Sequence, residues 1–168
     1  MELVAGILGN VFEINTKWIY NIYMLISFSF YFHWYRSILK RKEFRNTVLV
    51  FIILFVCTSL WNFAFQDWNY YHKYTFVTGA LFTMVCTLFH FGQLLGSDEV
   101  LDIRRNLSFW ISTGLLLFNM GMVPLMLLSR NLNFSELHYF VLIVTLNLIL
   151  YGCYSIGFLW TREKYNRY

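Results

Sequence analysis

Long apolar runs alternate with short polar linkers along the chain. Five runs of about 20 residues cover positions 18–38, 47–66, 74–95, 108–129 and 139–160. A bilayer core about 30 Å thick needs about 20 apolar residues in a helix that rises about 1.5 Å per residue. Each linker between the runs carries charged residues. The pattern therefore predicts an all-α integral membrane protein, in which a single domain forms a bundle of five transmembrane helices.

The composition of the chain agrees with a membrane location. Hydrophobic residues make up 58% of the sequence and charged residues only 13%, whereas a soluble domain carries about 25% charged residues. So few charges cannot coat a water-exposed surface. The basic residues fall between apolar runs and form no basic folded face, so we expect the lipid bilayer as a partner and no nucleic acid.

Lys and Arg residues are unequally divided between the two sides that five spans define. Of the 13 in the chain, ten lie in the first linker with its flank, the third linker and the tail. These ten are Arg36, Lys40, Arg41, Lys42, Arg45, Arg104, Arg105, Arg162, Lys164 and Arg167. The other side holds Lys17, Lys73 and Arg130. Since cytoplasmic loops are enriched in Lys and Arg, we expect a multi-pass protein of the bacterial inner membrane, with the N-terminus outside and the C-terminus cytoplasmic.

Aromatic residues mark the ends of the predicted spans. Each of the six tryptophans lies within about five residues of a span end or in a short linker, where an interfacial aromatic belt places them. The segment "DWNYYHKY", residues 67–74, is part of this pattern. We interpret it as an outer interfacial turn rather than as a binding loop.

The first 16 residues form a short apolar stub. Glu2 and Glu13 confine its apolar run to about ten residues, which is too short to span a membrane. The stub also lacks the basic start and the cleavage site of a signal peptide. It is either an interfacial segment or the end of a longer helix.

Four segments occur in a fixed order along nearly the whole chain. They are "KWIYNIYMLISFSF", the apolar hairpin after it, "SFWISTGLLLF" and "LNLILYGCYSIGFLW". This set resembles small polytopic inner-membrane proteins of AT-rich Gram-negative bacteria, which are found beside, or fused to, signalling histidine kinases. The resemblance implies a membrane module with a cytoplasmic signalling partner. It also implies about two further helices before "IYNIY", so that residues 1–16 would be the end of a missing helix.

Two histidines lie inside the predicted spans, and ionisable groups there are functional candidates by default. His33 and His90 each lie about five residues before the cytoplasmic end of a span. They would share one depth if the first and third spans are neighbours. Neutral imidazole binds haem and metals, so the pair is a candidate cofactor site. The alternative is that each histidine reaches the interface or makes one hydrogen bond. We expect no cofactor, with haem or a metal as the alternative.

Two asparagines form a second depth-matched pair. Asn119 and Asn147 lie about nine and eight residues from the outer ends of the fourth and fifth spans. A short linker joins these spans, which predicts an antiparallel hairpin. An unpaired amide in hydrocarbon costs several kcal/mol. We therefore expect an interhelical hydrogen bond between the two side chains.

The fourth and fifth spans also carry residues that shape helix packing. Pro124 removes one intrahelical hydrogen bond and predicts a kink in the fourth span. Small residues allow helix backbones to approach closely in lipid. They are Ser112, Thr113, Gly114 and Gly121 in the fourth run and Gly152, Ser155 and Gly157 in the fifth.

The sequence lacks several motifs that are typical of membrane enzymes. H-E-x-x-H, G-x-S-x-G and Walker patterns are absent, so we expect no catalytic residue and no metal site built from such motifs. Two classes of function stay open. The first is a sensory or interaction module coupled to a cytoplasmic or membrane protein partner, or to a second copy of the chain. The second is a small-molecule, haem or metal-binding protein, a redox carrier or enzyme, that uses His33 and His90.

Overall fold

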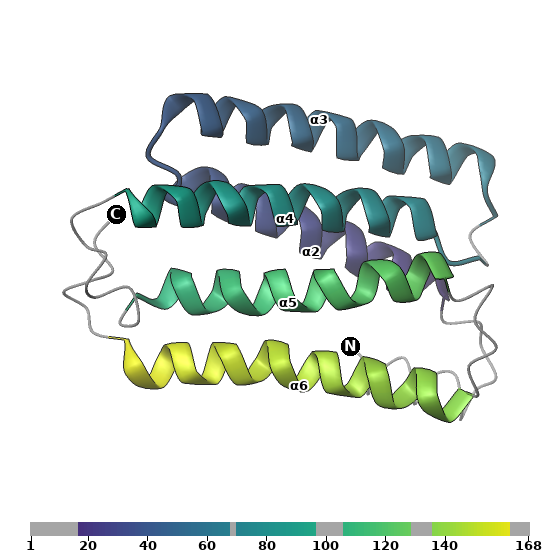
Figure 1. Ribbon diagram of the computed structural model, residues 1–168. Coiled ribbons are helices and arrows are strands. Elements are labelled where there is room, and N and C mark those ends of the chain that lie inside the picture. Colours follow the sequence, from purple (N-terminus) through teal and green to yellow (C-terminus); the bar gives the residue numbers. More distant parts are fainter. Residues whose placement is uncertain (1–16, 68–69, 97–105, 129–135, 162–168) are drawn as a thin grey trace.

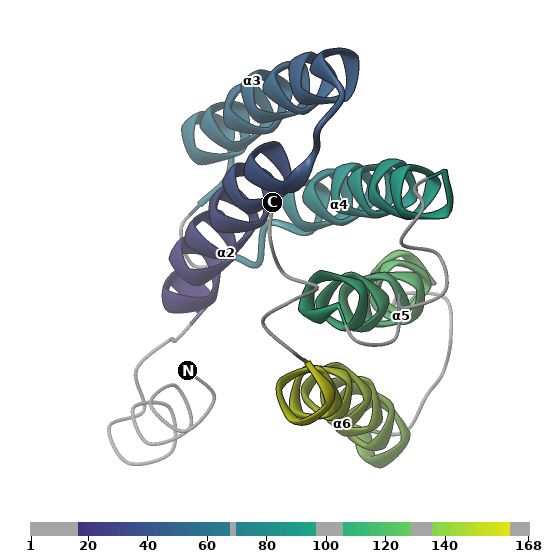
Figure 2. The same cartoon turned by 90° about the vertical axis from the view of Figure 1, so that its left-hand side faces the viewer.

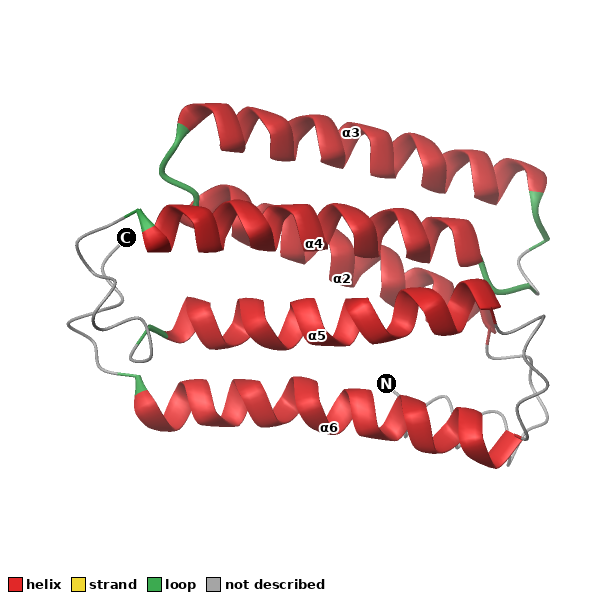
Figure 3. Cartoon of the chain, viewed as in Figure 1, coloured by secondary structure: helices red, strands yellow, loops and turns green. Residues whose placement is uncertain are grey.

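The computed structural model describes residues 17–67, 70–96, 106–128 and 136–161, and the secondary structure of these residues is entirely helical (Figure 3). The helices are α2 (Lys17–Ile38), α3 (Lys42–Phe65), α4 (Lys73–Leu95), α5 (Leu107–Leu128) and α6 (Glu136–Trp160). Each overlaps one of the five predicted apolar runs, so the prediction of an all-α bundle is confirmed. The predicted N-terminal stub, residues 1–16, lies outside the described residues.

Four of these helices are long and apolar enough to cross a membrane. They are α3, α4, α5 and the segment Leu137–Trp160 of α6. This is the helix content of a multi-pass membrane protein. Helix α2 has 22 residues, which is sufficient length, but its apolar residues are interrupted by polar ones such as Asn21, His33 and Arg36. A fifth span through α2 and the orientation of the termini stay predictions.

Helix α4 connects two parts of the bundle. It packs against both α2 and α3, which also pack against each other, and on another side it packs against α5. Helix α6 packs against α5 (Figures 1 and 2). The chain therefore consists of a three-helix unit, α2–α3–α4, and a hairpin, α5–α6. Extensive backbone contact between the two parts runs through α4 and α5.

The three-helix unit is held together by interlocking aromatic rings. Phe28 of α2 lies 5.7 Å, centroid to centroid, from both Phe55 of α3 and Phe76 of α4, in edge-to-face geometry. Such pairs add about 0.5–1.5 kcal/mol each beyond their buried area. The ring of Phe28 also covers Gly79, where an added Cβ would lie 2.7 Å from Phe28 Cδ2. The glycine therefore allows α4 to approach α2 closely at this point.

The α5–α6 hairpin packs through some of the small residues that the sequence indicated, whereas Gly152 and Ser155 lie away from the contact. A Cβ added at Gly114 would lie 3.0 Å from Cys153 Cβ and 3.2 Å from the carbonyl oxygen of Leu150. By contrast, no described side chain lies within 4 Å of a Cβ added at Gly152. Small residues at such a contact let helix backbones approach, which is a main source of helix association in lipid. Gly114 is therefore at the hairpin interface, and Gly152 faces outward.

Pro124 lies inside α5, with its side chain exposed, and the helix continues past it to Leu128. Figure 1 shows α5 changing direction toward its carboxyl end. The bend accords with the predicted kink, because proline cannot donate a backbone hydrogen bond and its ring clashes with the preceding turn.

The contrast between the two glycines of the hairpin gives a direct test of its packing. We expect Gly114→Leu to lower the free energy of unfolding in mixed micelles by about 1–3 kcal/mol, the usual cost of overpacking. Gly152→Leu is the matched control, since its side chain meets open space, and it should leave stability close to wild type. Equal effects of the two substitutions would contradict the packing described here.

Candidate functional site

A buried hydroxyl cluster joins the three-helix unit to the α5–α6 hairpin. It consists of Tyr35 on α2, Thr87 on α4 and Ser112 on α5, each fully buried. The Tyr35 hydroxyl lies 2.6 Å from Thr87 Oγ1 and 3.3 Å from Ser112 Oγ. These contacts span 52 and 77 residues of sequence. Three helices therefore meet at one phenol oxygen.

The protons of this cluster can be assigned from its geometry. Thr87 donates its only hydroxyl hydrogen to the carbonyl oxygen of Thr83, at 2.9 Å. The Tyr35 hydroxyl is consequently the donor in the 2.6 Å contact with Thr87. Its single proton also faces Ser112 Oγ at the longer distance. The phenol proton thus has two acceptors, one on α4 and one on α5.

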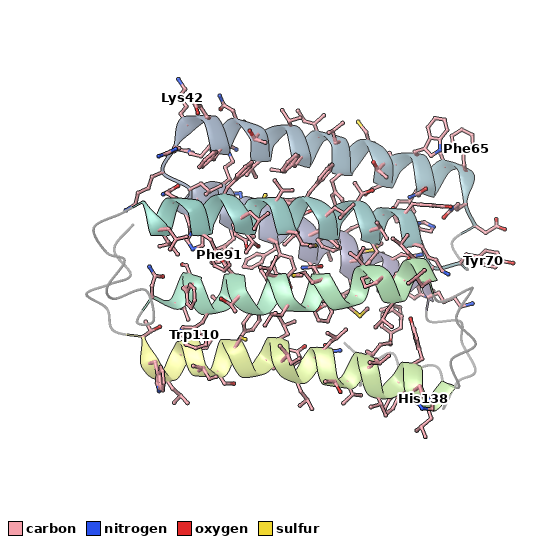
Figure 4. The ribbon with its side chains drawn as sticks, in the orientation of Figure 1. Lys42, Phe65, Tyr70, Phe91, Trp110 and His138 are labelled. Carbon is pink, nitrogen blue, oxygen red and sulfur yellow. The ribbon has the colours of Figure 1, made fainter. Side chains whose placement is uncertain are left out.

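His90 lies beside this cluster with an unpaired nitrogen. Its side chain is 2% exposed, and its Nε2 has no hydrogen-bond partner among the residues that the structure describes. The imidazole ring centroid lies 6.4 Å from the ring of Tyr35 and 6.3 Å from that of Phe91. Phe91 in turn lies between α4 and α5, where its ring packs against Phe109 at 5.6 Å (Figure 4). A buried polar atom without a partner is uncommon and requires a physical reason.

The structure places His33 and His90 in different environments. His33 is exposed on α2, whereas the α2 residue that meets His90 is Tyr35. Two residues along a helix correspond to a rotation of about 200°, so His33 and Tyr35 face nearly opposite directions. The two imidazoles therefore do not share the buried surface that holds the hydroxyl cluster. Within the described ranges, no group of three or more His, Cys, Asp or Glu side chains could hold a metal ion.

Asn119 and Asn147 each make a hydrogen bond within their own helix. Asn119 Nδ2 donates to the carbonyl oxygen of Leu115 at 2.7 Å, and Asn147 Nδ2 donates to that of Ile143 at 2.9 Å. Asn119 is 2% exposed, and Asn147 is partly buried. The local backbone carbonyls thus accept these hydrogens, where the sequence predicted a bond between the two side chains.

A second group of polar residues, not anticipated from the sequence, holds the end of the bundle opposite to Tyr35. Asn21 of α2 is fully buried. Its Nδ2 donates to the carbonyl oxygen of Tyr70 at 2.9 Å, and its Oδ1 accepts from the backbone N–H of His72 at 3.1 Å. One side chain therefore binds both neighbours of Tyr71 in the α3–α4 turn. Burial lowers the pKa of His72, although the backbone of Asp67 acts in the opposite direction.

The sequence did not single out Tyr35, Thr87 or Asn21, because residues of these types are common in membrane spans or at their ends. Tyrosine, threonine and serine occur in spans for many reasons, so their types alone gave no signal. Spacing could have identified Tyr35, because it continues a buried stripe with Phe28 and Phe32 at helical intervals. For Asn21, the only signal was an amide near the start of an apolar run.

No family profile, no curated protein and no solved structure matches this chain. The resemblance to inner-membrane proteins found near histidine kinases therefore stays a prediction, and functional inference rests on the geometry above.

The hydroxyl cluster should contribute measurably to stability. We expect Tyr35→Phe to lower the free energy of unfolding by about 0.5–1.5 kcal/mol, because it removes the donor to Thr87 and Ser112 while keeping the ring. Tyr23→Phe, at an exposed position on the same helix, is the control and should change little. Unfolding in mixed micelles, followed by circular dichroism, measures both. An unchanged Tyr35→Phe protein would mean that the cluster contributes no net stability.

Proposed function

We propose that this chain is a sensory or interaction module of the bacterial inner membrane, coupled to a cytoplasmic signalling partner. In this proposal α2 is the first of five spans, the N-terminus is outside and the C-terminus is cytoplasmic. The observation that carries the proposal is the hydroxyl cluster of Tyr35, Thr87 and Ser112, which links α2 to both α4 and α5.

The contact between the three-helix unit and the α5–α6 hairpin would allow the two parts to shift against each other. Extensive backbone contacts join the hairpin to the three-helix unit through α4 and α5. Helix α2 reaches the hairpin through a long side chain, because the Tyr35 hydroxyl contacts Ser112 Oγ of α5. Polar contacts of this kind can be exchanged more readily than an interlocked apolar surface. Rocking of one rigid part against another is a common form of switching.

The same end of the bundle carries the basic turn between α2 and α3. Arg41 and Lys42 lie there, and the backbone N–H of Lys40 donates to Gln93 Oε1 of α4 at 3.0 Å. Tyr35 is about one helical turn from Lys40, and His90 about one turn from Gln93. A change at the hydroxyl cluster therefore lies close to the surface that the orientation rule assigns to the cytoplasm.

The orientation can be tested by labelling single cysteines. On a background without the three native cysteines, Lys42→Cys should react with an impermeant maleimide only after cells are permeabilised. Asp67→Cys should react in intact cells, because it lies at the other end of α3. An epitope at the N-terminus should be accessible to antibody from outside if α2 crosses the membrane. An N-terminus on the same side as Lys42 would contradict the fifth span.

Partner coupling can be tested by photocrosslinking in cells. A photoreactive amino acid at Arg41 or Arg45 should capture the cytoplasmic part of a histidine kinase, and the same group at Tyr74 should not. Tyr35→Phe should change the yield of the crosslink while the protein remains in the membrane. Equal yields at both ends, or none at the basic turn, would contradict the proposal.

His90 supports a second candidate function, the binding of a small molecule, haem or metal. The supporting observation is its buried Nε2, which has no partner in the described part of the chain. If His90 binds a cofactor, the purified protein should show a haem absorption band or a stoichiometric metal, and His90→Ala should abolish it. His33→Ala is the comparison, since loss of the signal in both variants would indicate a shared site.

A further inference from the structure

The α3–α4 turn contains a hollow with an unusual lining. Its volume is ≈ 280 Å³. The lining residues are Gln66, Asp67, Tyr70, Tyr71, Lys73 and Tyr74. Three tyrosines, one carboxylate and one ammonium therefore surround a space at the end of the bundle. Figure 4 shows Tyr70 at this end, pointing away from the helices.

The backbone that forms the hollow is held by buried amides on two sides. Asn21 of α2 binds the carbonyl oxygen of Tyr70 and the N–H of His72. Asn62 Nδ2, in the last turn of α3, donates to Thr75 Oγ1, in the first turn of α4, at 2.6 Å. These hydrogen bonds restrain the backbone at Tyr70 and His72, on both sides of Tyr71, and such restraint favours a preorganised binding site.

The lining suits a group that carries an ammonium and a phosphate. Aromatic faces attract cations, and aromatic cages are a recurrent way to bind alkylated ammonium groups. The Tyr70 ring already shows this attraction, because Lys17 Nζ lies 5.8 Å from its centroid. Asp67 adds a carboxylate for the ammonium, and Lys73 supplies a positive charge for a phosphate. A purely anionic ligand would be attracted by Lys73 and Lys17 but would also face Asp67 and three electron-rich rings, whereas a zwitterionic group matches both signs of charge.

We infer that this hollow binds the headgroup of a zwitterionic phospholipid, of the phosphatidylethanolamine or phosphatidylcholine type. The volume is at the lower limit of ligand pockets, which begin at about 300 Å³, so it fits a headgroup rather than a whole lipid. The position also favours a lipid. The hollow lies between the end of the apolar helix α3 and the start of the apolar helix α4. Lipid headgroups occupy this level when the two helices cross a bilayer.

Binding can be measured with the full chain in a nonionic detergent. The probes are short-chain phosphatidylethanolamine and phosphatidylglycerol with identical acyl chains, counted by native mass spectrometry and titrated to obtain Kd. We expect the zwitterionic lipid to bind at least about five-fold more tightly than the anionic one. Equal affinity for the two lipids, or preference for phosphatidylglycerol, would overturn the inference.

Substitutions then locate the site. The double variant Tyr70→Leu/Tyr74→Leu and the variant Asp67→Asn should each weaken phosphatidylethanolamine binding by about five-fold. Tyr70→Phe/Tyr74→Phe keeps the rings and should retain binding, because the attraction for a cation needs the ring and not the hydroxyl. Circular dichroism of the leucine variant checks that it is folded. Tyr151→Leu, an exposed tyrosine on α6 outside the hollow, is the matched control and should bind as wild type. Unchanged binding by the leucine double variant would overturn the inference.

A competition experiment distinguishes a lipid headgroup from a soluble ligand with the same charged groups. Free phosphoethanolamine carries the same charged groups without acyl chains. We expect it to compete with the lipid only at concentrations far above those of the lipid itself, because the neighbouring apolar helix surface contributes to lipid binding. Competition at equal concentration would overturn the assignment to a lipid in favour of a soluble ligand. This test is independent of any signalling partner.

Discussion

The bundle depends on the need to satisfy polar groups that are buried between its helices. In an apolar surrounding, a hydroxyl without a partner costs free energy, so its position is tied to whichever helix supplies the partner. The Tyr35 hydroxyl lies 2.6 Å from Thr87 Oγ1 of α4 and 3.3 Å from Ser112 Oγ of α5. It fixes α2 relative to both helices at one end, and the Asn21 side chain fixes α2 relative to the α3–α4 turn at the other. The remaining apolar packing is arranged between these two polar contacts.

Apolar packing differs in kind between the two parts of the molecule. In the three-helix unit, large rings such as Phe28 and Phe55 interlock, which favours one arrangement of helices. In the hairpin, backbones approach through Gly114, and α6 leaves most of its surface exposed. A three-helix unit and a hairpin that meet mainly through α4 and α5 are components that a switch can use. This division is the structural basis for proposing a sensory or interaction module.

The sequence predicted the helices well, because hydropathy and length are what decide a membrane helix. It predicted the site less well. His90 and Asn119 are both buried, as polar residues in apolar runs tend to be. Their partners, however, depend on how each helix is rotated about its axis, and hydropathy does not reveal this rotation. Asn119 Nδ2 binds a carbonyl of its own helix, and His33 faces away from the surface that His90 occupies. Asn21 and Tyr35 were overlooked because an amide near a span end and a tyrosine in a span are common.

The central claim is that Tyr35 couples α2 to the hairpin through Ser112. A double-mutant cycle with Tyr35→Phe and Ser112→Ala, measured as free energies of unfolding in mixed micelles, tests it most directly. We predict a coupling free energy of about 0.5–1.5 kcal/mol between the two positions. Effects that add to within about 0.3 kcal/mol would contradict the claim.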